Sequence, residues 1–301
     1  MRHIKIAIVG DIHDQWDGGD HLALSHLQPD LVLFVGDIGN EALPLVEFIS
    51  TLTIPKAVIL GNHDAWYTAS EWGRKKSPYK NDGQGCRVTK QLEILGDCHV
   101  GYGYKDFPEL GLSVVGGRPF SWGGAEWKNA SFYAERFGVT DFQSSLDLIC
   151  AQARQAQCPH LIFLGHNGPI GLGELPSSPC GRDWQPLGGD YGDPDFYSAI
   201  EVCRLTRSVP LVAFGHMHHH LRVQPYYRET IVVQNGTVYV NAACVPRWRL
   251  VGASIFRFFT VVHLVDYQVE CVRQVWVDEN GTIGIEVVTT IPTVPGNLCL
   301  F

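Results

Sequence analysis

The sequence predicts an α/β protein in which two β-sheets pack on each other with helices outside. Short apolar runs rich in β-branched residues recur along the 301-residue chain, and they are too short for helices. Helical patterns lie between these runs, which is typical of parallel strands joined by helical crossovers. From residue 222 onward, alternating apolar residues and Asn-Gly turns indicate antiparallel strands instead.

The expected elements follow in chain order. Buried strands are expected at 4–9, 31–35, 57–60, 112–115, 161–164 and 211–214. Apolar residues at helical spacing predict helices over 45–52, after Glu41, and over 142–153, after Asp141. Asp193 and Pro194 resemble an N-cap and first turn, so a further helix is expected through 202.

The later segments predict a second sheet and a single domain. The turns Asn235-Gly236 and Asn280-Gly281 are typical of hairpins, and these late strands are expected to form a sheet packed on the first. Without an internal repeat or a low-complexity linker, 1–301 is expected to be one domain. Loop or cap insertions are expected at about 65–111, rich in aromatic, basic and glycine residues, and at 171–193, rich in proline and glycine.

Composition limits the function classes. The net charge is −8, which argues against a nucleic-acid partner, because such proteins usually carry a basic face. The nine cysteines occur singly, without a C-x-x-C pair, as expected for reduced thiols of a cytoplasmic protein. Arg257 and His263 interrupt the apolar stretch 253–265, so no membrane span is expected.

Five of the predicted strands end in the same way. Each is followed by a glycine and then by Asp, Asn or His, in the segments Gly10-Asp11-Ile12-His13, Gly36-Asp37, Gly61-Asn62-His63-Asp64, Gly165-His166 and Gly215-His216-Met217-His218. One Gly-Asp pair alone is ordinary turn chemistry. Five such segments, four of them with histidine, are better explained by ligand binding where the carboxyl ends of the strands meet.

This series of motifs resembles the signature of the calcineurin-like metallophosphoesterase superfamily. The resemblance spans residues 10–218, with all five blocks in order. It implies a four-layer α/β/β/α sandwich of two mixed β-sheets flanked by helices. It also implies two divalent metal ions, for which the mixed imidazole and carboxylate donors favour Mn²⁺, with Fe or Zn²⁺ as alternatives.

The resemblance assigns the metal ligands position by position. Asp11, His13 and His218 match the ligands of the first metal, whereas Asn62, His166 and His216 match those of the second. Asp37 would bridge both metals, because a carboxylate offers two oxygens. An i, i+2 spacing aims two side chains of a strand the same way, so His216 and His218 can both bind while Met217 turns aside.

Four nearby residues have other expected roles. His219 and His220 have no place in the pattern and are expected to support the ligands or to lie in solvent. The resemblance implies that His63 contacts the phosphoryl oxygen or protonates the leaving group. Asp64 is expected to orient the His63 ring, with a simple helix N-terminal charge as its alternative role.

The implied reaction is metal-dependent hydrolysis of a small phosphomonoester, phosphodiester or nucleotide-type substrate. Two metals about 3.5–4 Å apart lower the pKa of a bridging water, and the resulting hydroxide attacks phosphorus in line. Two alternatives from other classes are a scaffold that keeps the fold without catalysis and a nuclease. The full set of ligand positions disfavours the scaffold, and the acidic balance disfavours the nuclease.

The motifs differ from those of two known branches of the family, which argues against membership of either branch. The second block reads GDIGNEA and the third reads GNHD, which disfavours a Ser/Thr protein phosphatase. Asn40 stands where purple acid phosphatases have tyrosine, so a charge-transfer Fe(III) site is not expected.

The substrate contacts are expected among arginines and tryptophans, which suit a second phosphate and a ring, respectively. The main substrate-binding candidates are Arg118, Arg182, Trp184 and Arg247, and further rim candidates are Trp66, Tyr67, Arg74, Lys75, Lys76, Trp122 and Arg249. Segment 171–193, which starts soon after His166, is expected to form a lid or pocket wall, with simple coverage of apolar surface as its alternative role.

Overall fold

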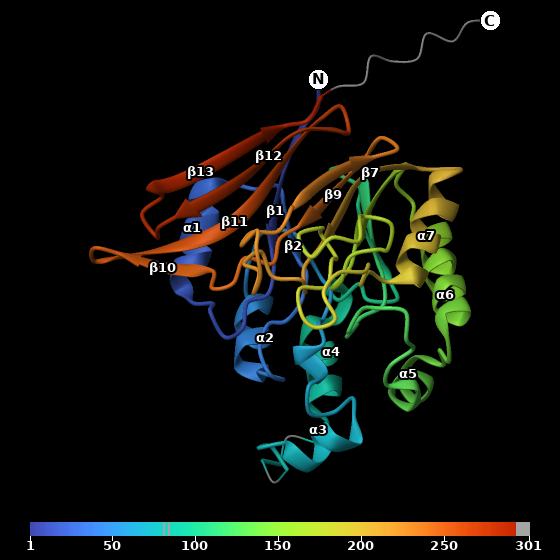
Figure 1. Ribbon diagram of the computed structural model, residues 1–301. Coiled ribbons are helices and arrows are strands. Elements are labelled where there is room, and N and C mark those ends of the chain that lie inside the picture. The colour runs from blue at the N-terminus through green and yellow to red at the C-terminus, as the bar shows by residue number, and fades with distance from the viewer. Residues whose placement is uncertain (81, 84, 293–301) are drawn as a thin grey trace, which may run out of the picture.

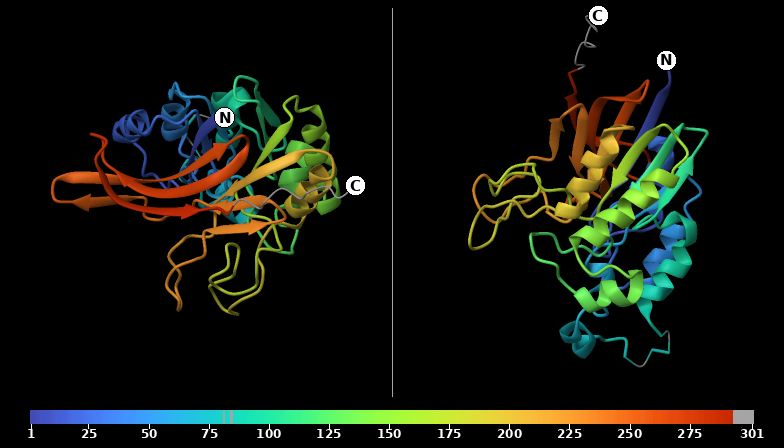
Figure 2. Two further views of the ribbon diagram at one scale, coloured as in Figure 1. Left: turned by 90° about the horizontal axis from the view of Figure 1, so that it is seen from above. Right: turned by 90° about the vertical axis from the view of Figure 1, so that its right-hand side faces the viewer.

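The first of two β-sheets combines the beginning and the end of the chain in the computed structural model, which describes residues 1–80, 82–83 and 85–292 (Figure 1). Its strands are β1 (His3–Val9), β2 (Leu31–Phe34), β3 (Lys56–Val58), β10 (Trp248–Val251), β11 (Ser254–Val265), β12 (Gln268–Val277) and β13 (Ile283–Thr290). The order is β13–β12–β11–β1–β2–β3, with β10 paired to β11. The long strands β10–β13 project beyond the rest of the molecule when it is seen from above (Figure 2).

The second sheet is built from the middle of the chain. Its strands are β4 (Tyr104–Phe107), β5 (Leu112–Gly116), β6 (His160–Leu164), β7 (Ser208–Phe214), β8 (Ile231–Gln234) and β9 (Thr237–Asn241). They lie in the order β4–β5–β6–β7–β9–β8. Both sheets are mixed, because β1–β2–β3 and β5–β6–β7–β9 are parallel runs and the remaining pairs are antiparallel.

Helices cover the outer faces of the two sheets. The described α-helices are α1 (Gly18–Leu27), α2 (Leu43–Ser50), α3 (Glu71–Lys76), α4 (Arg87–Leu95), α5 (Ala130–Phe137), α6 (Phe142–Gln155) and α7 (Pro194–Arg204). Short 3₁₀ turns occur at η1 (His63–Ala65) and η2 (Gly96–Cys98). In Figure 1, α1 and α2 lie beside the first sheet, whereas α6 and α7 lie together beside the second.

The strand residues alternate between two apolar clusters. Ile4, Ile6 and Ile8 of β1 belong to a cluster that also contains Ile162 and Leu211 of the second sheet, so this cluster fills the space between the sheets. Ala7 and Val9, with the opposite orientation, belong to the cluster that contains buried helix residues. Because successive strand side chains point to opposite faces, strands buried on both faces read as unbroken apolar runs. The predicted four-layer α/β/β/α sandwich of two mixed sheets flanked by helices is confirmed.

Several of the elements expected from the sequence are present in the structure. The six predicted early strands are present, and both Asn-Gly dipeptides lie between antiparallel partners, β8–β9 and β12–β13. The helix expected from Asp193 is α7, with Pro194 in its first turn. The Asp193 carboxylate does not cap α7, however, because it accepts hydrogen bonds from Arg118 and Ser121 instead.

The division into sheets differs from the expectation. The late strands do not form the second sheet by themselves: β11 pairs with β1, and β9 pairs in parallel with β7. These pairings join residues far apart in the sequence, such as His3 and Val265, so local pattern does not encode them. Segment 65–111 is not an irregular loop but holds α3, α4 and β4, whereas 171–193 contains no helix or strand.

Two further features bear on the environment of the protein. Within the described part of the chain, no helix has the length and apolar character needed to cross a membrane. The cysteines described in the structure are all free, and Cys299 lies outside the described residues.

Candidate metal centre

The ends of five strands bring polar side chains to one place. Asp11 and His13 follow β1, Asp37 follows β2, and Asn62 follows β3 in the first sheet. His166 follows β6, and His216 with His218 follows β7 in the second sheet. Since β1–β2–β3 and β6–β7 are neighbours within parallel runs, their carboxyl ends meet at one edge of the sandwich.

The glycines that precede these residues allow the chains to approach closely. A β-carbon on Gly61 would collide with Asp37 Oδ1 and with the ring of His166. A β-carbon on Gly215 would collide with Asp11 Oδ2. The glycine after each strand is therefore a steric requirement of the site and not only a turn signal.

Four of the seven expected ligands have left-handed backbone conformations. The φ angles of Asp11, His13, Asp37 and His216 are 49°, 43°, 51° and 66°. Such conformations are disfavoured in residues other than glycine and persist where the surrounding structure imposes them. Hydrogen bonds between the loops contribute, because the amide of His216 donates to Asp11 Oδ2 over 3.0 Å.

The first group consists of Asp11, His13 and His218, whose ligand atoms lie within 4.8 Å of one another. The distance from His218 Nε2 to Asp11 Oδ1 is 3.5 Å. The Nε2 atoms of His13 and His218 face each other at 3.2 Å. These are the three residues that the sequence assigns to the first metal.

The second group consists of Asp37, His166 and His216. His166 Nε2 lies 3.3 Å from Asp37 Oδ1 and 2.9 Å from Asn62 Oδ1. The other nitrogen of His166, Nδ1, donates to the backbone carbonyl of Val35 over 2.7 Å, and this bond directs Nε2 at the site. Asn62, His166 and His216 therefore lie together, as the sequence predicts.

Asp37 lies between the two groups. Its Oδ1 faces His166 in the second group, and its Oδ2 lies 3.8 Å from His13 Nε2 in the first. The same carboxylate accepts a hydrogen bond from the amide of His63, which fixes its orientation. Its two oxygens therefore point toward different groups.

The electrostatics of the site favour ionised carboxylates, whereas the imidazoles differ from one another. Burial opposes the charged form of His218, but the hydrogen bond and charge of Asp11 outweigh it and raise the pKa of His218. Burial alone would raise the pKa of Asp11, but the hydrogen bond and charge of His218 outweigh it and lower that pKa. Burial also opposes ionisation of Asp37, yet the charges of His166 and His63 lower its pKa. Burial lowers the pKa of His216 to about 3. Carboxylate anions and unprotonated imidazoles are the forms that bind cations.

His63 forms a third group of possible ligand atoms with His13 and Asp37, although it is not among the seven ligands expected from the sequence. Its Nε2 is 3.9 Å from Asp37 Oδ2, and its Nδ1 is 2.7 Å from Asn40 Oδ1. Burial lowers its pKa, so the ring is neutral and Nδ1 carries the proton donated to Asn40. Its ring stacks on Trp66, with centroids 4.5 Å apart.

Asp64 does not orient the ring of His63 as expected. Its buried carboxylate accepts hydrogen bonds from the backbone amides of Ile38, Gly39 and Gly61, at 3.0, 3.3 and 2.8 Å. These bonds hold the loop after β2 against the loop after β3. Asn40 contacts the ring instead, a role that the sequence did not reveal because Asn40 lies 23 positions earlier in the chain.

A cleft of about 260 Å³ opens over the metal-ligand groups. Trp66, Trp122 and Trp184 line it, and two cationic side chains that the sequence did not single out, Arg222 and Arg228, line it as well. Arg228 is buried and donates hydrogen bonds to the carbonyl oxygens of His218, Pro176, Ser178 and Gly181. In the sequence, only the position of Arg228 shortly after the histidines at 216–220 points to a place near the site.

The four main substrate-binding candidates lie in different places. Trp184 lines the cleft, whereas Arg182 donates from Nε to the carbonyl of Gly188 within its own segment. Arg118 is buried and pairs with Asp193 and Asp195 at 2.8 and 3.0 Å. Arg247 is buried and pairs with Asp20 at 2.6 Å. Neither Arg118 nor Arg247 lines the cleft, and both guanidinium groups are paired with buried carboxylates.

The last two histidines of the run differ from each other. His219 is buried, and its Nε2 donates to the carbonyl oxygen of Asn241 over 3.0 Å. His220 is exposed at the rim of the cleft. Neither belongs to a group of metal-ligating atoms found in the described residues.

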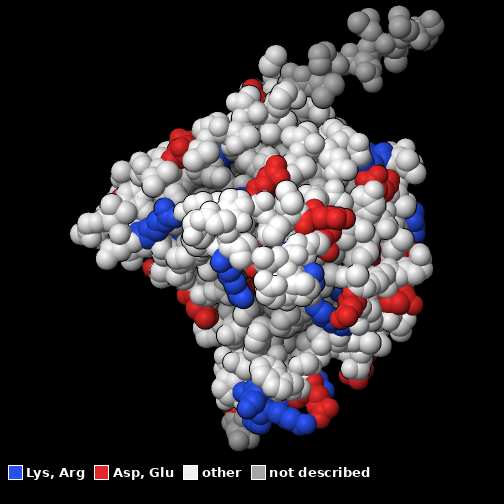
Figure 3. Space-filling view, in the orientation of Figure 1, with Lys and Arg blue, Asp and Glu red and all other residues white. Residues whose placement is uncertain are grey.

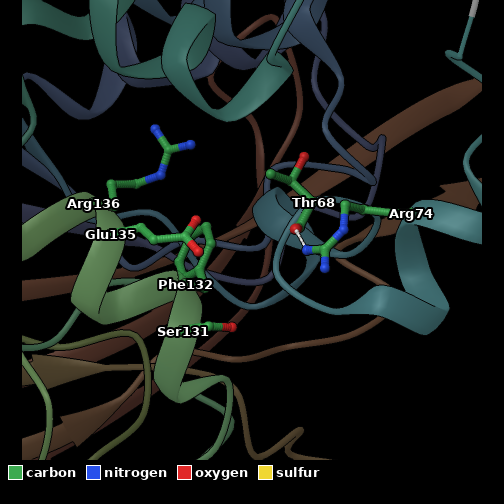
Figure 4. A pocket seen from close by; sticks show the side chains of 6 residues that line it. All are labelled: Thr68, Arg74, Ser131, Phe132, Glu135 and Arg136. Carbon is green, nitrogen blue, oxygen red and sulfur yellow. Dashed lines mark hydrogen bonds between the residues drawn. The ribbon is translucent and has the colours of Figure 1, made fainter.

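A larger cavity of about 590 Å³ lies elsewhere, between the segment around α3 and helix α5 (Figure 4). Its lining includes Arg74, Glu135 and Arg136. Arg74 is engaged with the carbonyl of Thr68 at 3.0 Å, and the described residues place no histidine or cysteine in its lining. The possible metal ligands line the smaller cleft and not this larger cavity, so size alone does not identify the candidate site.

On the face in Figure 3, basic and acidic side chains are interspersed, with a basic cluster at the lower end.

The fold and this arrangement of ligands define a metallophosphoesterase-type site. The calcineurin-like phosphoesterase family model matches residues 4–220, so the chain belongs to that family. Membership implies metal-dependent hydrolysis of phosphate esters. No curated protein matches the sequence significantly.

Solved structures with low sequence identity share the fold. One crystal structure aligns with 89% of this chain and 98% of its own, at 14% identity and a TM-score of 0.54. The purple acid phosphatase PPD1 from yellow lupin (Lupinus luteus) aligns with 96% of this chain and 54% of its own, at 15% identity and a TM-score of 0.45. A dimetal phosphatase from Danio rerio aligns with 95% and 98%, at 12% identity and a TM-score of 0.44.

Proposed function

We propose that this protein is a dinuclear metal-dependent phosphoesterase that acts on a small phosphorylated substrate, a monoester or a diester, in the cleft over the strand ends. The proposal rests on the convergence of ligand atoms from five strand ends. These atoms form three overlapping groups in the described residues, and Asp37 faces both His13 and His166. In this assignment Asp11, His13 and His218 hold one cation. Asn62, His166 and His216 hold the other, and Asp37 bridges.

The donor atoms fit cations. Asp11, His13 and His218 form one group of ligand atoms within 4.8 Å of one another, and Asp37, His166 and His216 form another. Asn62 Oδ1 lies 2.9 Å from His166 Nε2, so an amide oxygen joins the second group. Oxygen and ring-nitrogen atoms gathered in this way offer the lone pairs that a cation needs. The mixture of imidazole, carboxylate and amide donors favours Mn²⁺, with Fe or Zn²⁺ as alternatives.

The chain's own residues would position the ester for hydrolysis. When bound, the two cations would activate a water and neutralise charge on the phosphoryl oxygens. His63 lies beside Asp37 with Nδ1 held by Asn40, so its Nε2 is the atom available to contact the phosphoryl group or to pass a proton to the leaving group. Asp64 is a positioning residue in this arrangement, because its carboxylate accepts hydrogen bonds from three backbone amides in the loops after β2 and β3.

We further propose that residues 1–301 act as one domain, with 171–193 as a wall of the cleft. Asp183 and Trp184 from this segment line the cleft, which supports the wall. The free cysteines support a reducing compartment, for which we propose the cytoplasm.

The test combines metal analysis with a panel of phosphomonoesters, diesters and nucleotides assayed with Mn²⁺. The wild-type protein is expected to bind about two divalent ions per chain, and Asp37→Ala is expected to lose both, since it removes the shared ligand. His63→Ala is expected to keep its metal while kcat falls by about 10²- to 10⁴-fold.

His3→Ala is the matched control, because His3 is exposed at the opposite end of β1. A full metal content in Asp37→Ala would refute the bridging assignment. A wild-type protein that binds metal but hydrolyses no ester in the panel would favour a non-catalytic scaffold.

A further inference from the structure

We infer that the substrate carries a planar heteroaromatic ring, of the nucleobase type, on its leaving group and that a tryptophan pocket beside the metal centre binds this ring. The inference rests on the proposed function and specifies its substrate class. The pocket is defined here as the tryptophan pocket, and its lining includes Trp66, Trp72, Trp122, Lys128 and Asn129.

The tryptophan pocket has room for a ring and an apolar wall. Its volume is about 460 Å³, and three indole rings line it. Trp66 and Trp122 lie with centroids 5.2 Å apart, and Trp72 stands at 78° to Trp66. Tryptophan faces arranged as a corner suit a flat aromatic ring, which can lie against one indole and meet another with its edge.

The tryptophan pocket is continuous with the metal-centre cleft. Trp66 and Trp122 line both spaces. Trp66 also stacks on His63, because it follows the 3₁₀ turn η1, in which residues three apart lie on the same side. A group that leaves the phosphorus on the His63 side would therefore enter the tryptophan pocket.

The exposure of the indoles is unusual for residues of this size. Trp72 is 60% exposed, and Trp66 and Trp122 are only half-buried. Large aromatic side chains left open at a surface typically mark binding sites. A ligand ring in the tryptophan pocket would cover part of the exposed surface of each of these indole rings.

Polar groups at the edge of the tryptophan pocket favour a heteroaromatic ring over a plain hydrocarbon. The Asn129 amide offers a donor and an acceptor, and the Lys128 ammonium, which donates to the hydroxyl of Tyr191 over 2.7 Å, adds a cation. An amide beside a stacking surface is the kind of group that binds the ring nitrogens and exocyclic groups of a base.

The decisive comparison uses two esters with the same leaving oxygen, adenosine 5′-phosphate and ribose 5-phosphate, assayed with Mn²⁺. The methyl esters of both compounds serve as the diester pair. Wild-type protein is expected to favour the adenosine compound in kcat/KM by about 5- to 150-fold, the range of one stacked base. Trp122→Ala is expected to remove most of this preference, and Trp122→Phe to restore much of it.

Trp248→Ala on β10 is the matched control, and its preference should equal that of the wild type. Adenosine and ribose are also titrated calorimetrically into the metal-free protein, so that ring binding is measured without turnover. Failure to hydrolyse any ester with retained adenosine binding would refute the proposed function alone. Equal kcat/KM for both esters, or adenosine binding no tighter than that of ribose, would refute the ring pocket.

Discussion

At the scale of single residues, the metal centre depends on residues that bind nothing themselves. The glycines before Asn62 and His216 provide space for the carboxylates of Asp37 and Asp11, which a β-carbon would displace. The loops can therefore cross at contact distance, and this crossing imposes the left-handed conformations of four ligand residues.

Gly215→Ala tests this steric requirement. The new methyl group would push against Asp11 Oδ2, so the variant is expected to lose about one metal ion per chain and most of its activity. Elemental analysis and kcat provide the measurement. Gly18→Ala is the control, since nothing lies within 4 Å of a β-carbon there. Unchanged metal content in Gly215→Ala would contradict the crowding argument.

Asn40 is expected to act through His63. Its amide oxygen accepts the Nδ1 proton at 2.7 Å and thereby directs Nε2 toward the metal centre. Losing one neutral hydrogen bond corresponds to about 1 kcal/mol, so Asn40→Ala should lower kcat by about 5-fold, well short of the loss in His63→Ala. Asn40→Asp, which keeps the acceptor, should retain more activity. Equal kcat in Asn40→Ala and wild type would show that another group orients the ring.

At the scale of elements, segment 171–193 contains no helix or strand, and side chains from outside the segment fix its backbone by donating hydrogen bonds to its carbonyl oxygens. Arg228 donates to three of its carbonyl oxygens and to that of His218, a metal-ligand candidate. Asn241 adds hydrogen bonds to the carbonyls of Pro179 and Met217. These contacts join the wall of the cleft to the loop that carries His216 and His218.

Arg228→Met should therefore loosen the segment. Buried carbonyls left without donors cost about 1–3 kcal/mol, so the free energy of unfolding should fall by a similar amount. Hydrogen exchange should increase within 171–193, and KM should rise while metal binding changes less. Arg154→Met on the exposed face of α6 is the matched control. Unchanged hydrogen exchange in 171–193 would mean that the hydrogen bonds from Arg228 are not needed to hold the segment in place.

Within the same segment, Trp184 and Arg182 are expected to behave differently. Trp184 lines the cleft, whereas the Arg182 side chain folds back onto Gly188. Trp184→Ala should raise KM for the preferred substrate, because contacts remote from the reacting atoms act on binding and positioning. Arg182→Ala should change KM little, in contrast to the substrate role that the sequence suggested. A larger rise in KM for Arg182→Ala than for Trp184→Ala would show that Arg182 contacts the substrate.

At the scale of the whole molecule, the sequence predicts what is encoded locally. Strands that end in glycine and a polar ligand are local patterns, so the seven ligand candidates and their common edge could be identified. Arg118 and Arg247 looked like anion binders because their buried partners, Asp193 and Asp20, cannot be inferred from neighbouring residues. The insertion of β11 beside β1 is likewise a long-range pairing without a local signal.

Cation binding is expected to stabilise the whole domain. The buried carboxylates of Asp11 and Asp37 and the imidazole nitrogens that face them come from separate loops and are brought together only in the folded chain, so a cation bound there favours the folded state. A cation at 1,000 times its Kd stabilises the folded state by about 4 kcal/mol. At about 2–4 °C per kcal/mol for a large domain, Mn²⁺ should raise Tm by roughly 10 °C over protein treated with chelator. Calorimetry at a fixed scan rate measures the shift, and Asp37→Ala should abolish most of it because both groups lose their shared ligand. A similar shift in Asp37→Ala would place the stabilising metal outside this centre.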